Sequence, residues 1–131
     1  MAQIGAILVD THFILWLRVA PRQLTRDERE MLENAALRHV SIVSLWEIAI
    51  MMTVGRLPPD DQLLEAPQGF ELLPIRSEHC TVYSRLPLHH RDPFDRMLIA
   101  QAQSERLSLL TRDRAMLSYT EHAPILRFPE P

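Results

Sequence analysis

Two acidic residues in the stretch 89–102, Asp92 and Asp95, have the clearest potential for chemistry in this sequence. Pro93 suits the first position of a helix, where a missing N–H leaves no hydrogen bond unmade, and Asp92 before it is a good N-cap residue. Apolar residues then recur at helical spacing, and Asp95 lies one turn before Ile99 on that apolar stripe. Capping explains Asp92 adequately, whereas an acid on a buried stripe calls for a partner.

Three further acids, Asp10, Glu47 and Asp113, stand close to the ends of apolar runs. Asp10 and Asp113 follow runs that are typical of strands buried on both faces, and Glu47 comes one short turn after another such run. In a parallel sheet with helices on its faces, ligands bind outside the carboxyl ends of the strands. We therefore expect these three acids and Asp95 to converge at one edge of a sheet.

The repulsion between four neighbouring carboxylates predicts a metal ion, because they cannot all stay charged without a cation. Oxygen ligands favour magnesium or manganese over zinc. Cys80 is the only cysteine, which excludes a cysteine-based zinc cage, and His89 and His90 are interpreted as part of a partly exposed loop. Such ions position a phosphate oxygen and make hydroxide available from water, so the predicted reaction is phosphodiester hydrolysis.

Each acid also has a purely structural interpretation. Ser44 and Glu47 match the capping-box pattern, the same role that we assign to Glu28, so capping explains Glu47 equally well. Asp10 and Asp113 are each suited to cap the helix that follows them. No single acid is decisive, but the joint pattern favours a site, because all four fall where a buried run meets a helix.

The elements that position these acids alternate between short apolar runs and longer amphipathic segments. The expected strands are 4–9, 40–43, 70–73 and 107–110, with a short edge strand at 125–126. The expected helices are 13–19, 25–37, 44–54, 77–86 and one starting at Pro93, with a short helix after 60–61. This alternation predicts an α/β fold, with one domain over residues 1–131 and helices on both faces of a parallel sheet.

The composition limits the partners and the compartment. The net charge is −3 and the pI about 6.0, so no overall positive field attracts nucleic acid, and such binding needs a local basic patch. A lone cysteine fits a reducing compartment. Because no segment suits a signal peptide or a membrane span, we expect a cytoplasmic protein with no membrane partner.

Four motifs of the chain together resemble those of a known family. They are Asp10-Thr11-His12, Ser44-Leu45-Trp46-Glu47-Ile48-Ala49-Ile50, Asp92-Pro93-Phe94-Asp95-Arg96-Met97-Leu98-Ile99-Ala100-Gln101-Ala102 and Leu110-Thr111-Arg112-Asp113. In this order and spacing they resemble the motifs of PIN domains, and more closely those of the VapC-type toxins of bacterial toxin–antitoxin pairs. The resemblance implies a three-layer α/β/α sandwich with a short central parallel sheet, and a magnesium- or manganese-dependent endoribonuclease activity.

The resemblance also implies roles for particular residues. The metal-site and catalytic acids correspond to Asp10, Glu47, Asp95 and Asp113. The small hydroxyl residues that support them correspond to Thr11, Ser44 and Thr111, and Asp92 is a supporting cap that also orients the site. We infer that local positive charge for substrate binding comes from Arg96, Arg112 and Arg114.

The partners that the resemblance implies are an RNA substrate, a second copy of the chain and a cognate antitoxin that itself binds operator DNA. Met51 stands where close relatives often carry lysine, which leaves antitoxin or substrate contact on that helix open. Two other functions also stay open. One is a catalytically weak PIN-fold module that acts by binding an antitoxin and its DNA complex, and the other is a related metal-dependent DNA nuclease.

Overall fold

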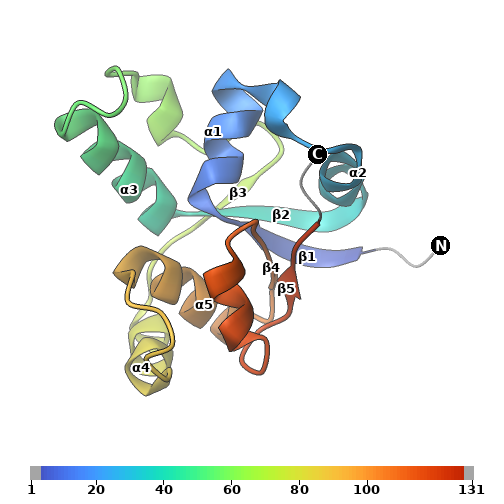
Figure 1. Cartoon of the computed structure of the whole chain (residues 1–131), viewed down its shortest axis with the longest axis vertical. Helices are drawn as coiled ribbons and strands as arrows, with labels where there is room; N and C mark the ends of the chain where they lie inside the picture. The colour runs from blue at the N-terminus through green and yellow to red at the C-terminus, as the bar shows by residue number, and fades with distance from the viewer. Residues whose placement is uncertain (1–3, 129–131) are drawn as a thin grey trace.

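The structure, a computed structural model, describes residues 4–128. Its middle layer is a five-stranded parallel sheet in the order β3-β2-β1-β4-β5 (Figure 1). The strands are β1 (Ile4–Val9), β2 (Ala35–Ser41), β3 (Glu71–Leu73), β4 (Ser108–Leu110) and β5 (Ile125–Leu126). The predicted parallel α/β sheet is therefore confirmed.

Helices cover both faces of this sheet. The α-helices are α1 (Thr11–Val19), α2 (Arg26–Asn34), α3 (Ile42–Thr53), α4 (Ser77–Arg85) and α5 (Pro93–Glu105). Short 3₁₀ helices are η1 (Pro21–Gln23), η2 (Asp61–Leu64) and η3 (Arg114–Tyr119). Figure 1 shows α1, α2 and α3 on one side of the sheet, and α4 and α5 on the other. The three-layer sandwich is thus also confirmed.

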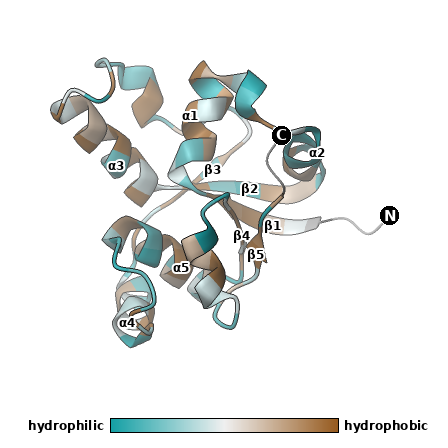
Figure 2. Ribbon diagram, viewed as in Figure 1, coloured by the Kyte–Doolittle hydropathy of each residue, from teal (hydrophilic) through white to brown (hydrophobic). Residues whose placement is uncertain are grey.

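The core divides into two halves because successive side chains of a strand point to opposite faces. Ile7 and Val9 of β1 pack with α1 and α3 on one face, and Leu8 between them packs with Leu98 of α5 on the other. All four of these side chains are fully buried. Figure 2 shows the hydrophobic colouring along the strands, followed by a hydrophilic segment where β4 leads into η3.

The central strand β1 fixes the position of its neighbours. Val9 lies opposite Val40 of β2 on one side and Leu110 of β4 on the other. The backbone N–H of Asp10 also donates to the Leu110 carbonyl at 3.0 Å. The carboxyl ends of these three strands therefore meet at one edge, so the residues that follow them emerge side by side.

The predicted boundaries between residues 34 and 44 were wrong. The helix expected over 25–37 ends at Asn34, and the strand expected over 40–43 consists of the last two residues of β2 and the first two of α3. Pairing of β2 with the central strand β1 along its length outweighs the local helical pattern. The apolar run at 40–43 is too short for periodicity to separate strand from helix.

The N-cap of α3 is Ser41 and not Ser44. The Ser41 hydroxyl accepts a hydrogen bond from the Val43 N–H at 3.0 Å, so the N-cap lies three residues earlier than predicted. The expected capping box of Ser44 and Glu47 is therefore wrong, and both side chains lie within the helix. Glu47 therefore does not cap α3, and its carboxylate is available to the site at the carboxyl ends of the strands.

The start of α5 was predicted correctly. Asp92 is its N-cap, and Asp92 Oδ1 accepts hydrogen bonds from the N–H groups of Phe94 at 2.8 Å and Asp95 at 3.3 Å. The capping box of Thr25 and Glu28 at the start of α2 is present as well. Within the described range of the chain, no helix is long and apolar enough to cross a membrane.

Candidate metal centre

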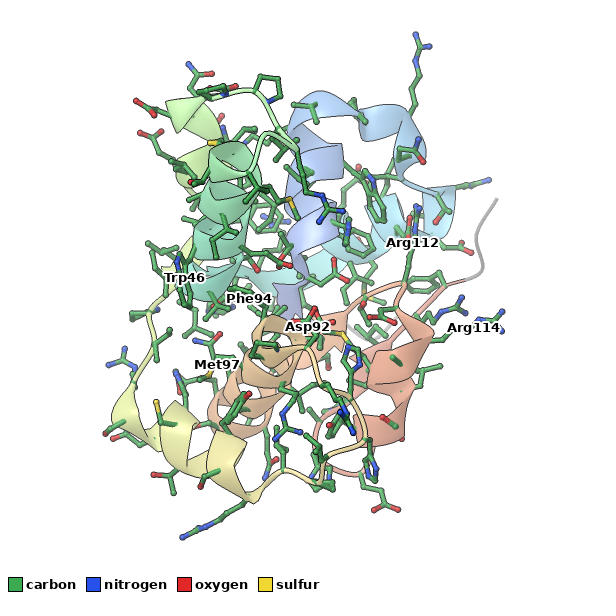
Figure 3. The ribbon with its side chains drawn as sticks, turned by 60° about the vertical axis from the view of Figure 1, so that its left-hand side comes forward. Trp46, Asp92, Phe94, Met97, Arg112 and Arg114 are labelled. Carbon is green, nitrogen blue, oxygen red and sulfur yellow. The ribbon has the colours of Figure 1, made fainter. Side chains whose placement is uncertain are left out.

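A cavity of about 470 Å³ lies at the carboxyl ends of β1 and β4, where the strand order of the sheet reverses. It is lined by Asp10, Thr11, His12, Trp16, Glu47, Asp92, Asp95, Arg112 and Asp113. The structure thus brings together all four acids that the sequence predicted, and it adds Asp92 to them. Figure 3 shows Asp92 near the middle of the molecule, with Trp46 and Phe94 to one side and Arg112 to the other.

Asp10 is the buried acid of the cavity. Its Oδ1 accepts from the N–H groups of His12 at 3.0 Å and Phe13 at 3.4 Å, so it does cap α1. Its Oδ2 accepts from Thr111 Oγ1 at 2.5 Å. Burial raises the pKa of the Asp10 carboxyl, and the hydrogen bond from Thr111 opposes that rise. The capping role and a place in the site are therefore compatible, because each uses a different oxygen.

Glu47 reaches the cavity from α3. Its Oε1 accepts from the hydroxyl of Thr11 at 2.6 Å, and Thr11 Oγ1 lies 3.0 Å from Ser44 Oγ. Thr11 and Ser44 are both buried. Two of the three hydroxyl residues singled out from the sequence thus hold Glu47 against the first turn of α1.

The side chain of His90, which was not predicted to belong to the site, contacts Asp95 and lies close to Asp113. The imidazole Nε2 of His90 lies 2.8 Å from Asp95 Oδ2 and 3.8 Å from Asp113 Oδ2. Burial raises the pKa of Asp95 to about 7, and the charges of Asp92 and Asp113 add to this rise while the hydrogen bond from His90 opposes it. His90 was predicted to belong to a partly exposed loop, and its contact with the acids was not predicted.

Thr111 connects the two acids that follow β1 and β4. Besides donating to Asp10, its Oγ1 accepts from the Asp113 N–H at 3.0 Å. Asp113 in turn caps η3, where its Oδ1 accepts from the Ala115 N–H at 2.9 Å. The third predicted hydroxyl residue therefore touches the site directly.

Arg112 lines the cavity, and its guanidinium group forms an ion pair with Glu28. Its Nε lies 2.8 Å from Glu28 Oε2 and its Nη2 lies 2.6 Å from Glu28 Oε1, which is a bidentate contact. The guanidinium group also stacks over the ring of Trp16, 4.0 Å from its centroid. Glu28 thus has a second role beyond its capping box, and no local pattern in the chain indicates it.

The prediction that Arg96 contacts substrate does not fit its position. Arg96 is 7% exposed, and its Nη1 donates to the Pro87 carbonyl and to the Tyr119 hydroxyl, each at 2.9 Å. It also stacks over the ring of Tyr83. Arg96 points away from the cavity because helix α5 turns its side chain toward the loop before it. Arg114, the first residue of η3, is exposed and does not line the cavity.

The donor groups fit a hard divalent cation. Five carboxylates line one cavity, and two of them, Asp10 and Asp95, have pKa values raised in its present state. A divalent cation at this point would balance the charge of carboxylates whose ionised form burial disfavours. Oxygen-rich sites of this kind suit Mg²⁺ and Mn²⁺. The residues present therefore match the ion that the acid pattern predicted.

The fold and this site define an α/β protein with an acidic centre at the carboxyl edge of a parallel sheet. A family model described as "PIN domain" matches residues 7–121. Because this match covers most of the chain, the protein belongs to the PIN domain family, as the sequence motifs suggested.

Individual relatives agree with this assignment. The chain is similar to "Ribonuclease VapC22" of Mycobacterium tuberculosis (strain ATCC 25618 / H37Rv), with 25% identity over 127 residues that cover 91% of this chain and 95% of the relative. Its fold is similar to that of VapBC2 from Rickettsia felis, solved bound to a promoter DNA fragment, with a TM-score of 0.71, 13% identity and coverage of 95% and 99%. It is also similar to VapBC-5 from Mycobacterium tuberculosis, with a TM-score of 0.64, 18% identity and coverage of 94% and 98%.

Proposed function

We propose that this protein is the VapC-type toxin of a type II toxin–antitoxin pair and that it hydrolyses RNA phosphodiester bonds with Mg²⁺ or Mn²⁺. The observation that carries the proposal is the convergence of four acids from four separate segments, Asp10, Glu47, Asp95 and Asp113, in one cavity. The similarity to a protein named as a ribonuclease supports an RNA substrate. The fold that it shares with two VapBC proteins supports the toxin assignment.

The acids act as ligands in this proposal, and the hydroxyl residues hold them in place. A bound divalent cation supplies Lewis-acid stabilisation of the phosphodiester and a reactive hydroxide from water. Thr11 fixes Glu47, and Thr111 fixes Asp10 and the backbone of Asp113. The hydrogen bonds from Thr11 and Thr111 each satisfy one lone pair of a carboxylate oxygen, and the remaining lone pairs of Glu47 and of Asp10 Oδ2 would be available to a cation.

Cleavage of a structured RNA by the purified protein, with Mg²⁺ or Mn²⁺ added, tests the activity. We expect Asp10→Ala and Asp95→Asn to abolish cleavage while circular dichroism shows a preserved fold. Asp27→Asn, which changes an exposed acid in the first turn of α2, should cleave like the wild type. Undiminished cleavage by both site variants would overturn the proposal.

The two other functions make different predictions for related measurements. A DNA nuclease would cleave a matched DNA strand faster than the RNA. A catalytically weak binding module would show no Asp10-dependent binding of Mn²⁺ by calorimetric titration. We expect cleavage of the RNA strand, and Mn²⁺ binding that is lost in Asp10→Ala.

We further propose that the toxin forms a homodimer through the outer face of α3. This helix carries one charged residue, Glu47. Trp46 on its outer face and Val54 at its C-cap are 59% and 61% exposed. Trp46 packs edge-on against Phe94 of α5, with ring centroids 5.2 Å apart, so both helices contribute to the apolar face (Figure 3). A contiguous exposed apolar face of this kind typically marks a protein–protein contact.

Light scattering coupled to gel filtration tests the homodimer. Trp46→Asp should convert a dimer to a monomer. Val19→Asp changes a side chain that is also 59% exposed, at the end of α1, and should leave the dimer intact. A wild type that stays monomeric at high concentration would rule this interface out.

The proposed protein partner is a cognate antitoxin, and operator DNA is bound only through it. The solved complex of Rickettsia felis VapBC2 with promoter DNA supports this arrangement. We place the pair in the cytoplasm, whose reducing conditions suit the exposed Cys80. Co-expression with the product of the adjacent upstream gene should give a stable complex that shifts operator DNA, whereas the toxin alone should not.

A further inference from the structure

His90 lies inside the acid cluster, although it belongs to a loop. Its Nε2, Asp95 Oδ2 and Asp113 Oδ2 lie within 4.8 Å of one another, the one such group of potential metal ligands found among residues 4–128. The His90 side chain is 23% exposed, and that of Asp95 is 19% exposed. An imidazole nitrogen therefore stands among the carboxylates, where the sequence predicted oxygen ligands alone.

The loop that carries His90 is held in place by a buried side chain. Tyr119 is fully buried, and its hydroxyl accepts from the backbone N–H groups of His89 at 3.1 Å and His90 at 3.0 Å. The same hydroxyl donates to the Pro87 carbonyl at 2.8 Å, and Arg96 donates to that carbonyl and to the hydroxyl. These contacts fix the backbone from which the His90 imidazole reaches the acids.

His89, the neighbouring histidine, shows that this placement is specific. Its backbone makes the same contact with Tyr119, but its ring packs beside the Tyr119 ring, with centroids 5.3 Å apart. His89 is exposed and does not join the group of potential ligands. Only one of the two adjacent imidazoles is therefore directed at the acids, which makes His89 a matched control.

The spacing around His90 is that of ligands sharing one ion. Neighbouring ligand atoms on a cation with bonds of ~2.1 Å are roughly 3 Å apart, and opposite ones roughly 4 Å. The distances from His90 Nε2 to the two carboxylates, 2.8 and 3.8 Å, are close to these two separations. Imidazole is a good ligand for transition metals, whereas Mg²⁺ prefers oxygen.

Building on the proposed function, we infer that His90 is a nitrogen ligand of the cation held by Asp95 and Asp113. The site then has a mixed nitrogen–oxygen donor set, and this set favours Mn²⁺ over Mg²⁺. His90 is not one of the four acids on which the nuclease proposal rests. The inference therefore adds a ligand and a metal preference to that site.

Electron paramagnetic resonance of Mn²⁺ bound to the full-length protein tests the inference directly. We expect the electron spin echo to be modulated by a coordinated ¹⁴N nucleus. Incorporating ¹⁵N-labelled histidine into the wild type should replace this signal with a ¹⁵N coupling, without any change to the fold. The modulation should disappear in His90→Ala and persist in His89→Ala.

Metal affinities provide a second readout. In His90→Ala, the dissociation constant for Mn²⁺ should rise by about tenfold or more. The dissociation constant for Mg²⁺, measured by competition, should change much less, so the preference for Mn²⁺ falls. Both constants should stay at wild-type values in His89→Ala.

The outcomes separate this inference from the proposed function. Mn²⁺ binding that depends on Asp10 and Asp95 but shows no histidine nitrogen coupling would overturn the role of His90. It would not contradict the proposed acid site. An unchanged Mn²⁺ affinity in His90→Ala would do the same. A wild type that binds no Mn²⁺ would overturn both.

Discussion

Thr111 Oγ1 lies 2.5 Å from Asp10 Oδ2, although these two residues are 101 positions apart in the chain. The same hydroxyl accepts from the N–H of Asp113, so one buried side chain sets the positions of two acids. Both contacts arise because β1 and β4 are neighbours and end at the same level of the sheet. The spacing between the acids is therefore fixed by the sheet before any cation binds.

Replacing Thr111 with valine should weaken cation binding. The hydroxyl lowers the pKa of Asp10, so its loss raises that pKa further and leaves less of the carboxylate form for the metal. We expect a roughly tenfold weaker affinity for Mn²⁺ by calorimetry at pH 7. Thr111→Ser keeps the hydroxyl and should retain most of the affinity. Equal affinities in the valine and wild-type proteins would show that this hydrogen bond does not tune the site.

Stability of the metal-free protein should fall as the pH rises toward 8. The pKa of Asp95 is about 7 in the folded state against 3.8 for the unperturbed group, so the folded state holds more protons between these values. The stabilising contribution is complete below about pH 4 and is lost as the pH rises through 7. Between pH 6 and pH 8 the free energy of unfolding should fall by about 1 kcal/mol.

Urea unfolding in the presence of a chelator, at pH 6 and pH 8, measures this change. Asp95→Asn cannot take up this proton, so its dependence on pH should be smaller, and at pH 8 it should be more stable than the wild type. Added Mn²⁺ should restore the stability of the wild type at pH 8. A pH dependence that is identical in Asp95→Asn would contradict the assignment of the raised pKa to this residue.

The buried pair of Glu28 and Arg112 should contribute strongly to stability. Burial alone would raise the pKa of Glu28, but hydrogen bonds from Arg112 and Thr25 outweigh it and hold that pKa below its ordinary value. The Glu28 side chain is 1% exposed, so Glu28→Ala would remove a buried carboxylate that makes a bidentate contact with the Arg112 guanidinium group. We expect a loss of about 3 kcal/mol in the free energy of unfolding.

Glu30, on the same helix, provides the control for this measurement. Its carboxylate pairs with Arg26 at 3.0 Å, but the Glu30 side chain is 53% exposed. Glu30→Ala should therefore cost less than about 0.5 kcal/mol. Similar losses of stability in the two variants would mean that burial does not increase the contribution of the Glu28–Arg112 pair.

Removing the hydroxyl of Tyr119 should loosen the loop before α5. Tyr119→Phe leaves the N–H groups of His89 and His90 without their acceptor, while the buried ring stays in place. We expect about 1–3 kcal/mol of lost stability and faster hydrogen exchange at these two amides. Amide exchange followed by NMR provides the measurement. Unchanged protection at both positions would show that other contacts hold the loop.

The parts of the fold that sequence reasoning predicted are those set by local chemistry. The apolar runs of β1 and β4 and the Asp92-Pro93 helix start depend on residues next to one another. The convergence of the acids followed from a general rule for parallel sheets and did not require their exact boundaries. The error of several residues at the start of β2 therefore left the predicted set of acids unchanged.

The parts that were missed depend on contacts between distant residues. Arg112 meets Glu28 across 84 positions, and Tyr119 meets the backbone of His90 across 29. Arg96 was expected at the substrate because it adjoins Asp95 in the sequence, yet neighbours on a helix point in different directions. Neither of the two pairings, nor the direction of the Arg96 side chain, has a signature in the spacing of the chain.

The neighbours of β1 in the sheet have a consequence for how the protein is made. β2, which pairs with one side of β1, follows it soon in the sequence. β4, which pairs with the other side, and Asp113 come much later in the chain. A ribosome that has reached residue 90 has produced Asp10 and Glu47 but neither of the acids that His90 contacts. The proposed nuclease therefore cannot attack RNA while most of it is still being translated, because its set of acids is complete only after Asp113 has been added.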